Sequence, residues 1–289
     1  MKRTVNLVIL LFVIQLVRAQ SPVQKGNKIA YIDSNGKIVN EGMFKRGTPF
    51  SEGLAAVDVA GAGQKPKWFF IATDFTIQIP YGYDSVGQFS GGLCPIKKDG
   101  LWIYIGTNGL IRIDAKFTEA GNFIQGKAKV KDENGVYLID TLGEKLTNQY
   151  FEDISTWNES FFGGLPKREP FWIVMNYAGE TVLKDSFYGV WPSDDHTICV
   201  NRLGGYRFVD NKGNLLYGKA FLEAGPFSQG WASVRFENDW FLMDETGKIK
   251  KDLRMKGSVM MRGAITPAIN YNGNAGFLDR KANWIYQTP

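Results

Sequence analysis

The chain has 289 residues, and its 34 lysines and arginines against 29 aspartates and glutamates give a formal net charge of +5 at pH 7. Lys2, Arg3 and Arg18 lie in an N-terminal segment that we expect to be removed, and 34 minus 3 leaves 31 basic residues against 29 acidic ones, about +2. This balance argues against nucleic acid or an anionic membrane as a partner, because both need a clustered basic face. His196 is the single histidine and the sequence has no CxxC or HExxH motif, so we predict no metal ion and no cofactor.

The first 19 residues have the pattern of a secretory signal peptide. Lys2 and Arg3 precede the mostly apolar run Val5–Val17, and Val17-Arg18-Ala19 suits cleavage after Ala19. A membrane anchor is the alternative, but the run is shorter than the ~20 residues that a bilayer requires. We therefore predict a signal peptide at 1–19, an exported chain without an integral membrane segment, and a periplasmic, cell-surface or secreted location.

A short phrase, aromatic–x–aromatic–apolar–polar–x–x–Gly, then recurs along the chain. Its apolar residues are 34 to 39 residues apart: Ile32, Ile71, Ile105, Ile139, Met175, Val209, Met243 and Leu278. A regular period of this length indicates supersecondary units that bury their apolar faces only by stacking on one another. We predict one repeat domain at 20–289 with about seven and a half repeats.

Each repeat contains short stretches with strand character. In the third copy the aromatic phrase gives a strand at 102–105, and the tight turn that follows it ends at Gly109. Phe117 and Phe123 then stand six residues apart, as two aromatics do in several copies. The segment 126–130 alternates apolar and polar residues, which is typical of a strand with one buried face.

These patterns predict an all-β fold of tandem antiparallel repeats of about 34 residues. No apolar period of 3.6 residues runs for ten residues, so helices are not expected. Such units close into a propeller, here with about seven blades, or stack into an open twisted β superhelix. Both ends of the array show the same half of the repeat, so we keep the open array as the alternative.

The repeat resembles the WG-repeat family, also called KWG repeats. The resemblance lies in 50–55 (FSEGLA), 227–232 (FSQGWA), 31–33 (YID) and 276–279 (GFLD), and it extends over about 27–287. It implies a non-enzymatic repeat protein that binds or scaffolds at the cell envelope, and it supplies no catalytic residues.

The repeated polar and aromatic positions each have two interpretations. The turn aspartates are Asp33, Asp140, Asp210, Asp244 and Asp279. We predict that they cap their turns rather than bind calcium, because each turn offers one carboxylate where a Ca²⁺ loop needs several. We predict that the repeated aromatics fill the core between repeats rather than form a sugar-stacking ladder.

The repeat pattern loosens between Gly143 and Gly213, and functional residues tend to lie where local rules fail. The candidate ligand contacts there are Trp157, Arg168, Trp191, Asp194, Asp195 and His196. An ordinary degenerate loop is the alternative for this stretch. Asp195 and His196 near Ser193 resemble a catalytic group, but neighbours on one loop rarely assemble the geometry of a triad. We therefore predict no catalytic residue.

Three functions follow from these observations. The first is an exported, non-enzymatic binding or scaffolding module whose partner is an envelope protein or polysaccharide, with Trp157 and Trp191 as anchors. The second is a lectin-like carbohydrate-binding protein. The third, less favoured, is an envelope hydrolase built on a propeller, which would need a converging pair of carboxylates.

Export would permit a disulfide between Cys94 and Cys199. The two cysteines lie about three repeats apart, however, and repeats in an array mainly contact their neighbours. We predict two separate buried thiols.

Overall fold

The computed structural model describes residues 21–33, 37–58, 65, 67–193, 196–261 and 265–287. Within these ranges the regular secondary structure consists of β-strands alone, and the strands are joined by turns. The predicted signal peptide, Asp194 and Asp195 lie outside the described residues. The all-β prediction is confirmed.

The strands form seven antiparallel sheets. The first three contain β1 (Ser21–Lys25), β2 (Lys28–Ile32) and β3 (Ile38–Phe44); then β4 (Arg46–Gly47), β5 (Leu54–Asp58), β6 (Trp68–Ala72) and β7 (Ile77–Tyr83); then β8 (Ser85–Val86), β9 (Leu93–Lys98), β10 (Leu101–Gly106) and β11 (Ile111–Phe117). The fourth contains β12 (Glu119–Ala120), β13 (Lys127–Asp132), β14 (Gly135–Asp140), β15 (Phe151–Trp157), β16 (Phe161–Pro166), β17 (Trp172–Asn176) and β18 (Thr181–Phe187). The last three contain β19 (Gly189–Pro192), β20 (Ile198–Arg202), β21 (Gly205–Val209) and β22 (Leu215–Phe221); then β23 (Glu223–Ala224), β24 (Trp231–Phe236) and β25 (Asp239–Asp244); then β26 (Ile265–Ile269), β27 (Ala275–Asp279) and β28 (Trp284–Gln287).

The eight copies of the aromatic phrase fall on β2, β6, β10, β14, β17, β21, β25 and β27, which we call the phrase strands of units 1 to 8. The seven-stranded sheet holds two of them, β14 and β17, because a single residue pair, Val136 with Phe151, joins unit 4 to unit 5. Seven sheets therefore contain eight repeats.

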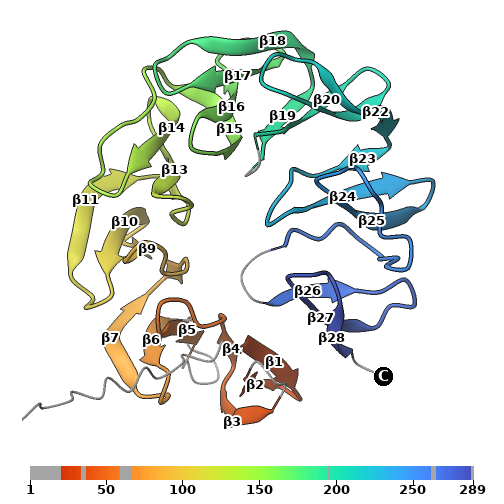
Figure 1. The fold of residues 1–289 in the computed structure, drawn as a ribbon. Coiled ribbons are helices and arrows are strands. Elements are labelled where there is room, and N and C mark those ends of the chain that lie inside the picture. Colours follow the sequence, from red (N-terminus) through yellow and green to blue (C-terminus); the bar gives the residue numbers. More distant parts are fainter. Residues whose placement is uncertain are drawn as a thin grey trace, which may run out of the picture.

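The units are arranged as a ring around a centre (Figure 1), so the array is propeller-like and not an open superhelix. The first sheet, β1–β3, stands beside the last, β26–β28, and side chains of both border one groove. In the four-stranded sheets the strands run in chain order from a short first strand to a long fourth one, as from β4 to β7. Figure 1 places that fourth strand on the outside of the ring.

The connection from the short first strand to the second strand of a unit ends in a two-residue turn. In unit 4, Ile124 bridges Lys127, while Gln125 and Gly126 have φ of 50° and 72°. Positive φ at both central residues is the type I′ pattern, whose twist matches that of a hairpin. The glycine in this position meets that demand without the strain that a side chain would bring.

The core lies between neighbouring units, at the residue just before the repeated apolar residue of each phrase strand. These central residues are at most 1 % exposed in units 1 to 7: Tyr31, Phe70, Tyr104, Leu138, Val174, Phe208 and Leu242. Where the central residue is aromatic, a phenylalanine of the next unit packs on it. The ring centroids are 5.3 Å apart for Tyr31–Phe50, 5.1 Å for Phe70–Phe89, 5.0 Å for Tyr104–Phe123 and 5.2 Å for Phe208–Phe227. The prediction that the repeated aromatics form the inter-repeat core is confirmed for these rings.

Hydrogen bonds also run from unit to unit. The Ser51 hydroxyl donates to the Phe89 carbonyl at 2.6 Å, and the Gln88 N–H donates to the Asn122 side chain at 2.9 Å. Further along, the Ser228 hydroxyl donates to the Met261 carbonyl at 2.8 Å. These polar groups thus form hydrogen bonds that join neighbouring units of the ring.

The turn aspartates act as predicted. The Asp210 carboxylate accepts the N–H of Lys212 at 2.8 Å and of Asn214 at 2.9 Å, and Asp140, Asp244 and Asp279 accept in the same pattern. Hydrogen bonds to the charged form hold the pKa of Asp210 below its usual range, with the Asn214 side chain as the main cause. Turn capping is therefore confirmed for these residues.

Cys94 and Cys199 are both free and buried, as predicted. Burial raises the pKa of both thiols well above the usual value, because the thiolate would lose its hydration.

Candidate functional site

The irregular stretch that the sequence singled out forms units 5 and 6. Units 2, 3, 4 and 7 begin with a two-residue strand, whereas unit 5 begins with the seven-residue β15. Residues 157–161, within the stretch where the repeat pattern loosens, form the end of this longer strand, its turn and the start of β16.

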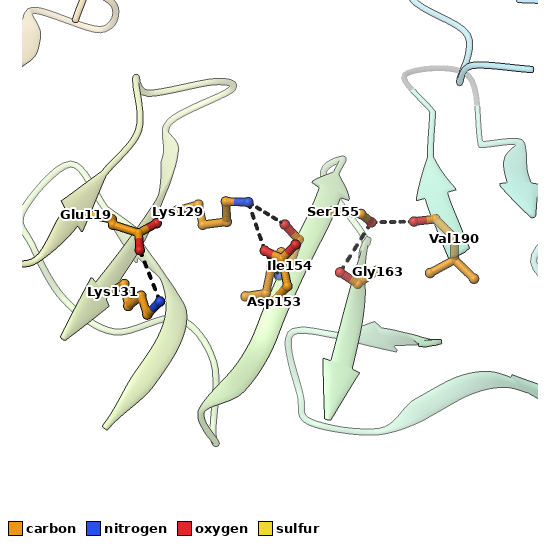
Figure 2. Close-up of polar contacts among 8 residues, drawn as sticks. All are labelled: Glu119, Lys129, Lys131, Asp153, Ile154, Ser155, Gly163 and Val190. Carbon is orange, nitrogen blue, oxygen red and sulfur yellow. Dashed lines mark hydrogen bonds and ion pairs between the residues drawn. The ribbon is translucent and has the colours of Figure 1, made fainter. Parts of the chain in front are cut away.

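Polar contacts hold β15 between its neighbours (Figure 2). The Lys129 ammonium of β13 donates to the Asp153 carboxylate at 3.0 Å and to the Ile154 carbonyl at 2.8 Å. On the other side, the Ser155 hydroxyl donates to the Val190 carbonyl of β19. The longer strand thus makes the junctions on both sides of unit 5.

Trp157 and Trp191 come from adjacent strands in space. The Thr156 hydroxyl donates to the Pro192 carbonyl at 2.9 Å, and the Asn158 side chain donates to the Ser193 carbonyl at 2.9 Å. These contacts bring the end of β15 against the end of β19. His196 follows in the same loop, exposed, with φ of 71°.

Both tryptophans also have structural tasks. The Trp157 indole N–H donates to the Ile124 carbonyl of unit 4 at 3.0 Å. The Trp191 ring stacks on Tyr206, with centroids 5.7 Å apart and planes 18° apart. The Ser193 hydroxyl is buried and accepts the N–H of Phe227 at 2.9 Å. Trp157 thus helps to join unit 5 to unit 4, Ser193 helps to join unit 6 to unit 7, and Trp191 packs within unit 6.

Arg168 lies away from this group. It is exposed, with φ of 63°, in the turn after β16, whereas Trp157 pairs with Phe162 at the start of that strand. At about 3.3 Å per residue of strand, the two ends are roughly 15–20 Å apart. The ends of β15 and β19 therefore lie together, with His196 in the loop that follows β19, whereas the two indoles contact different neighbours and Arg168 lies at the opposite end of β16.

A second candidate site lies between the first and last units of the ring, and no sequence pattern had indicated it. We call it the seam groove. It has a volume of about 900 Å³ and is bordered by Val23, Gln24, Ile32 and Ile38 of unit 1 and by Lys256–Val259, Pro267–Ile269 and Ala275–Phe277 of unit 8. Its lining is mainly aliphatic and aromatic, as is usual for ligand sites in proteins.

Phe277 distinguishes this junction from the others. It is the central residue of unit 8, and it pairs with Tyr286 as Tyr31 pairs with Asn40 in unit 1. Its seven counterparts are completely buried, but Phe277 is partly exposed at the groove wall. No local signal reveals this, because the exposure depends on what lies across the seam.

The groove has a simple electrostatic character. Lys256 is the one charged side chain among its lining residues, and Gln24 and Ser258 supply the neutral polar groups. Ile269 is 47 % exposed and lines the groove. The groove is therefore apolar with a positive rim.

A shallower groove of about 790 Å³ lies beside Trp231. It is bordered by Lys219, Lys248, Lys250 and Lys251 together with Asp244 and Asp252. The Trp231 indole N–H donates to the Arg280 carbonyl at 3.1 Å, and the Lys250 ammonium lies 6.0 Å from the indole ring centroid. This surface combines a ring with excess positive charge.

Two further findings concern metal-binding clusters and membrane-spanning helices in the described part of the chain. Its histidines, cysteines, aspartates and glutamates form no cluster of three or more suited to a metal ion. None of its segments is a helix long and apolar enough to cross a membrane.

Comparison with solved structures supports the fold. A structure described as the eukaryotic initiation factor aligns with a TM-score of 0.57 at 10% identity, over 92% of this chain and 84% of that one. The computationally designed Ika8 protein aligns with a TM-score of 0.53 at 12% identity, over 91% of this chain and 96% of that one. At such identities the likeness concerns the fold alone. No curated protein sequence matches the chain.

The family comparison concerns the repeats themselves. The model of the WG containing repeat matches residues 30–61, 68–102, 104–137 and 206–240. The first three matches together contain the phrase strands of units 1 to 3, and the fourth contains that of unit 6. The sequence alone had indicated a resemblance to the same repeat. The chain therefore contains segments that match the WG containing repeat, the repeat that its sequence resembles.

Proposed function

We propose that this chain is an exported, non-enzymatic binding or scaffolding module that holds a partner at the cell envelope. The observation that carries the proposal is the seam groove, a concave and mainly apolar site of about 900 Å³ between the first and last units. Export rests on the signal-peptide pattern of residues 1–19.

The apolar wall favours a protein partner over a polysaccharide. Sugars offer many hydroxyls, and burying them against Val23, Ile38 and Phe277 would leave those hydroxyls without hydrogen bonds. An aliphatic or aromatic side chain of a protein partner has no hydroxyl, so its burial in the groove would leave no hydroxyl without a hydrogen bond.

Affinity capture from an envelope extract tests the proposal. The bait is residues 20–289, and half of the extract is first digested with a protease that is then inactivated. Ile269→Glu places a charge in the groove, and Ile111→Glu is the matched control, because Ile111 is a strand isoleucine that is 55 % exposed away from the groove. We expect capture by the wild-type and Ile111→Glu baits, and loss of capture after digestion or with Ile269→Glu. Equal capture by all three baits would contradict a role for the groove.

Export is tested separately. Expressed in full length, the chain should yield a mature protein that begins at Gln20 and fractionates outside the cytoplasm. A cytoplasmic product that retains residues 1–19 would refute this part of the proposal.

Carbohydrate binding is the second candidate, favoured by the Trp231 groove. A partly exposed indole offers an apolar face for a sugar ring, and the surrounding lysines suit an anionic glycan. Capture that survives protease digestion and is lost in Trp231→Ala, but not in Ile269→Glu, would establish this alternative.

A further inference from the structure

Unit 7 differs from units 2, 3 and 6 at its outer edge. In those units the outer strand is a strand of seven residues, β7, β11 or β22. The equivalent segment of unit 7 bridges the phrase strand β25 at one residue near each end, Ile249 and Met255. Between them the Leu253 N–H donates to the Lys250 carbonyl at 3.1 Å. A turn thus replaces the middle of the outer strand.

This turn changes which residues reach the surface. Leu253 is 4 % exposed, whereas Tyr81, at the same place in β7, is 64 % exposed. Leu253 packs in the core between units 7 and 8, while Lys251 and Asp252 are exposed. The turn therefore buries an apolar side chain and presents charged side chains to the groove beside Trp231.

Trp231 stands where unit 2 carries a buried leucine. It bridges Ser228 as Leu54 bridges Ser51, and Leu54 is 7 % exposed. Trp231 is partly exposed, and its N–H already donates to the Arg280 carbonyl at 3.1 Å. A ligand at this indole would therefore contact the ring face rather than accept a hydrogen bond from it.

The Trp231 groove carries an excess of positive charge. Two aspartates border it against four lysines, which are Lys219, Lys248, Lys250 and Lys251. Of the two carboxylates, that of Asp244 already accepts N–H groups of its own turn. Within the described ranges, no ion pair involves any of the four lysines.

Basic residues at the edges of other sheets have acidic partners. Arg46 pairs with Asp58 at 2.9 Å in unit 2, and Lys131 pairs with Glu119 at 3.0 Å in unit 4. The contrast leaves the charge of the Trp231 groove for an anionic ligand.

The Trp231 groove is separate from the seam groove, and among the described residues the two share no lining residue. One segment borders both, since residues 248–252 line the first groove and residues 256–259 line the second. Between these stretches Leu253 and Met255 are buried, which anchors the segment. Different ligands can therefore fill the two grooves at the same time.

We propose that the Trp231 groove binds an acidic polysaccharide while the seam groove holds a protein partner. A sugar ring lies on the Trp231 indole, and the acidic groups of the polysaccharide lie beside Lys248 and Lys251. A neutral sugar would use the ring alone and a polyphosphate the lysines alone, whereas an acidic polysaccharide uses both. The carbohydrate site adds to the proposed binding function, on which it rests, and the chain tethers a protein to an anionic polymer.

Polygalacturonate, which has a carboxylate on each sugar ring, tests the site. It is immobilised, and the binding of residues 20–289 is followed by biolayer interferometry. We expect saturable binding that about 0.5 M NaCl weakens, because salt screens exposed charges. Trp231→Leu, which copies Leu54 of unit 2, should weaken binding about tenfold or more, because one aromatic anchor carries much of such an interface.

The charge is tested with a second set of variants. The double variant Lys248→Gln/Lys251→Gln should weaken binding by a similar factor. Its matched control is Lys98→Gln/Lys116→Gln, at two exposed lysines of unit 3, and it should bind like the wild type. Ile269→Glu should bind like the wild type as well, because it alters the seam groove. The lysine variants keep the test decisive if Trp231→Leu unfolds, since changes at exposed side chains rarely affect stability.

Absent binding, or binding that both groove variants retain, would overturn the proposal. Soluble competitors then identify the chemistry. Polyphosphate or polyglutamate that competes as well as polygalacturonate would indicate a site for any polyanion, and dextran that competes as well would indicate a site for neutral sugars. Either result contradicts an acidic polysaccharide. Capture from the extract that still depends on Ile269 would leave the protein-binding function standing in each case.

Discussion

Single side chains carry out the same task at each turn that follows a phrase strand. Asp244 accepts the N–H of Thr246 and of Lys248, each at 3.0 Å, and the Thr246 hydroxyl donates to it as well at 2.6 Å. These hydrogen bonds hold the pKa of Asp244 below its usual range, the Thr246 side chain being the main cause. The carboxylate is partly exposed, so its main contribution is to fix the turn rather than to form a buried ion pair.

Asp244→Ala should lower the midpoint of urea unfolding, whereas Asp244→Asn should retain most of the stability at pH 7, because an amide oxygen also accepts both N–H groups. The lowered pKa of Asp244 also predicts how the stability of the protein changes with pH. A lowered folded pKa contributes stability above the unfolded value of about 3.9, and this stability is lost as pH falls through the folded pKa. Between pH 5 and pH 3 the free energy of unfolding should therefore decrease less for Asp244→Asn than for the wild type.

The control for this series is Asp252→Ala, at an exposed aspartate outside the repeated turn. Unfolding curves at both pH values that coincide for Asp244→Ala and Asp252→Ala would contradict the capping role.

The two thiols provide a second prediction at this scale. Cys94 and Cys199 are completely buried and their pKa values are raised by burial, so few thiolates form and reagents cannot reach them. Ellman's reagent at pH 8 should label neither thiol in the native protein and both after denaturation. Rapid labelling of one equivalent in the native state would show that its site opens.

At the scale of the element, each unit completes its core with a residue from the next one. Tyr104 is buried by Phe123 of the following unit, and its hydroxyl donates to the Gly121 carbonyl at 2.8 Å. Burial raises the pKa of this phenol, which stays protonated and keeps its role as a donor. The junction, rather than the single sheet, is thus the unit of packing.

Phe123→Ala should lower the free energy of unfolding by about 3–5 kcal/mol, because it removes a buried ring and leaves a cavity against Tyr104. Leu110→Ala is the control, since Leu110 is 60 % exposed and should change stability by less than about 0.5 kcal/mol. Urea unfolding followed by tryptophan fluorescence measures both variants. Similar losses in the two would mean that the junction ring does not bear on stability.

Much at this scale was predictable from sequence. The aromatic phrase, its turn and the strand of alternating residues define a unit because their signals are local. The length of β15 was visible only as a break in the pattern around Trp157. What the break accomplishes, the contacts of Lys129 and Ser155 with neighbouring units, depends on the packing of three units.

At the scale of the whole molecule, the curvature decides what the sequence leaves open. The repeat spacing is compatible with both a ring and a superhelix, and only the accumulated rotation between units brings β1–β3 beside β26–β28. Phe277 illustrates the limit, since it stands at the same place in its phrase strand as the buried central residues, while it borders a groove with residues more than 200 positions away, such as Val23 and Ile38. The candidate contacts predicted from sequence lie in the irregular stretch between Gly143 and Gly213, whereas the seam groove is bordered by units 1 and 8.

The ring that brings the first and last units together is the central claim, and a single distance tests it. Gln24→Cys and Ser258→Cys place spin labels at exposed positions on the two sides of the groove, while Cys94 and Cys199 stay buried and unlabelled. Double electron–electron resonance on residues 20–289 should then give a distance below about 30 Å, because both residues border one groove and adjacent sheets lie ~10 Å apart. An open stack of eight units at that spacing would separate the labels by roughly 70 Å. A distribution centred beyond about 50 Å would contradict the ring and, with it, the seam groove.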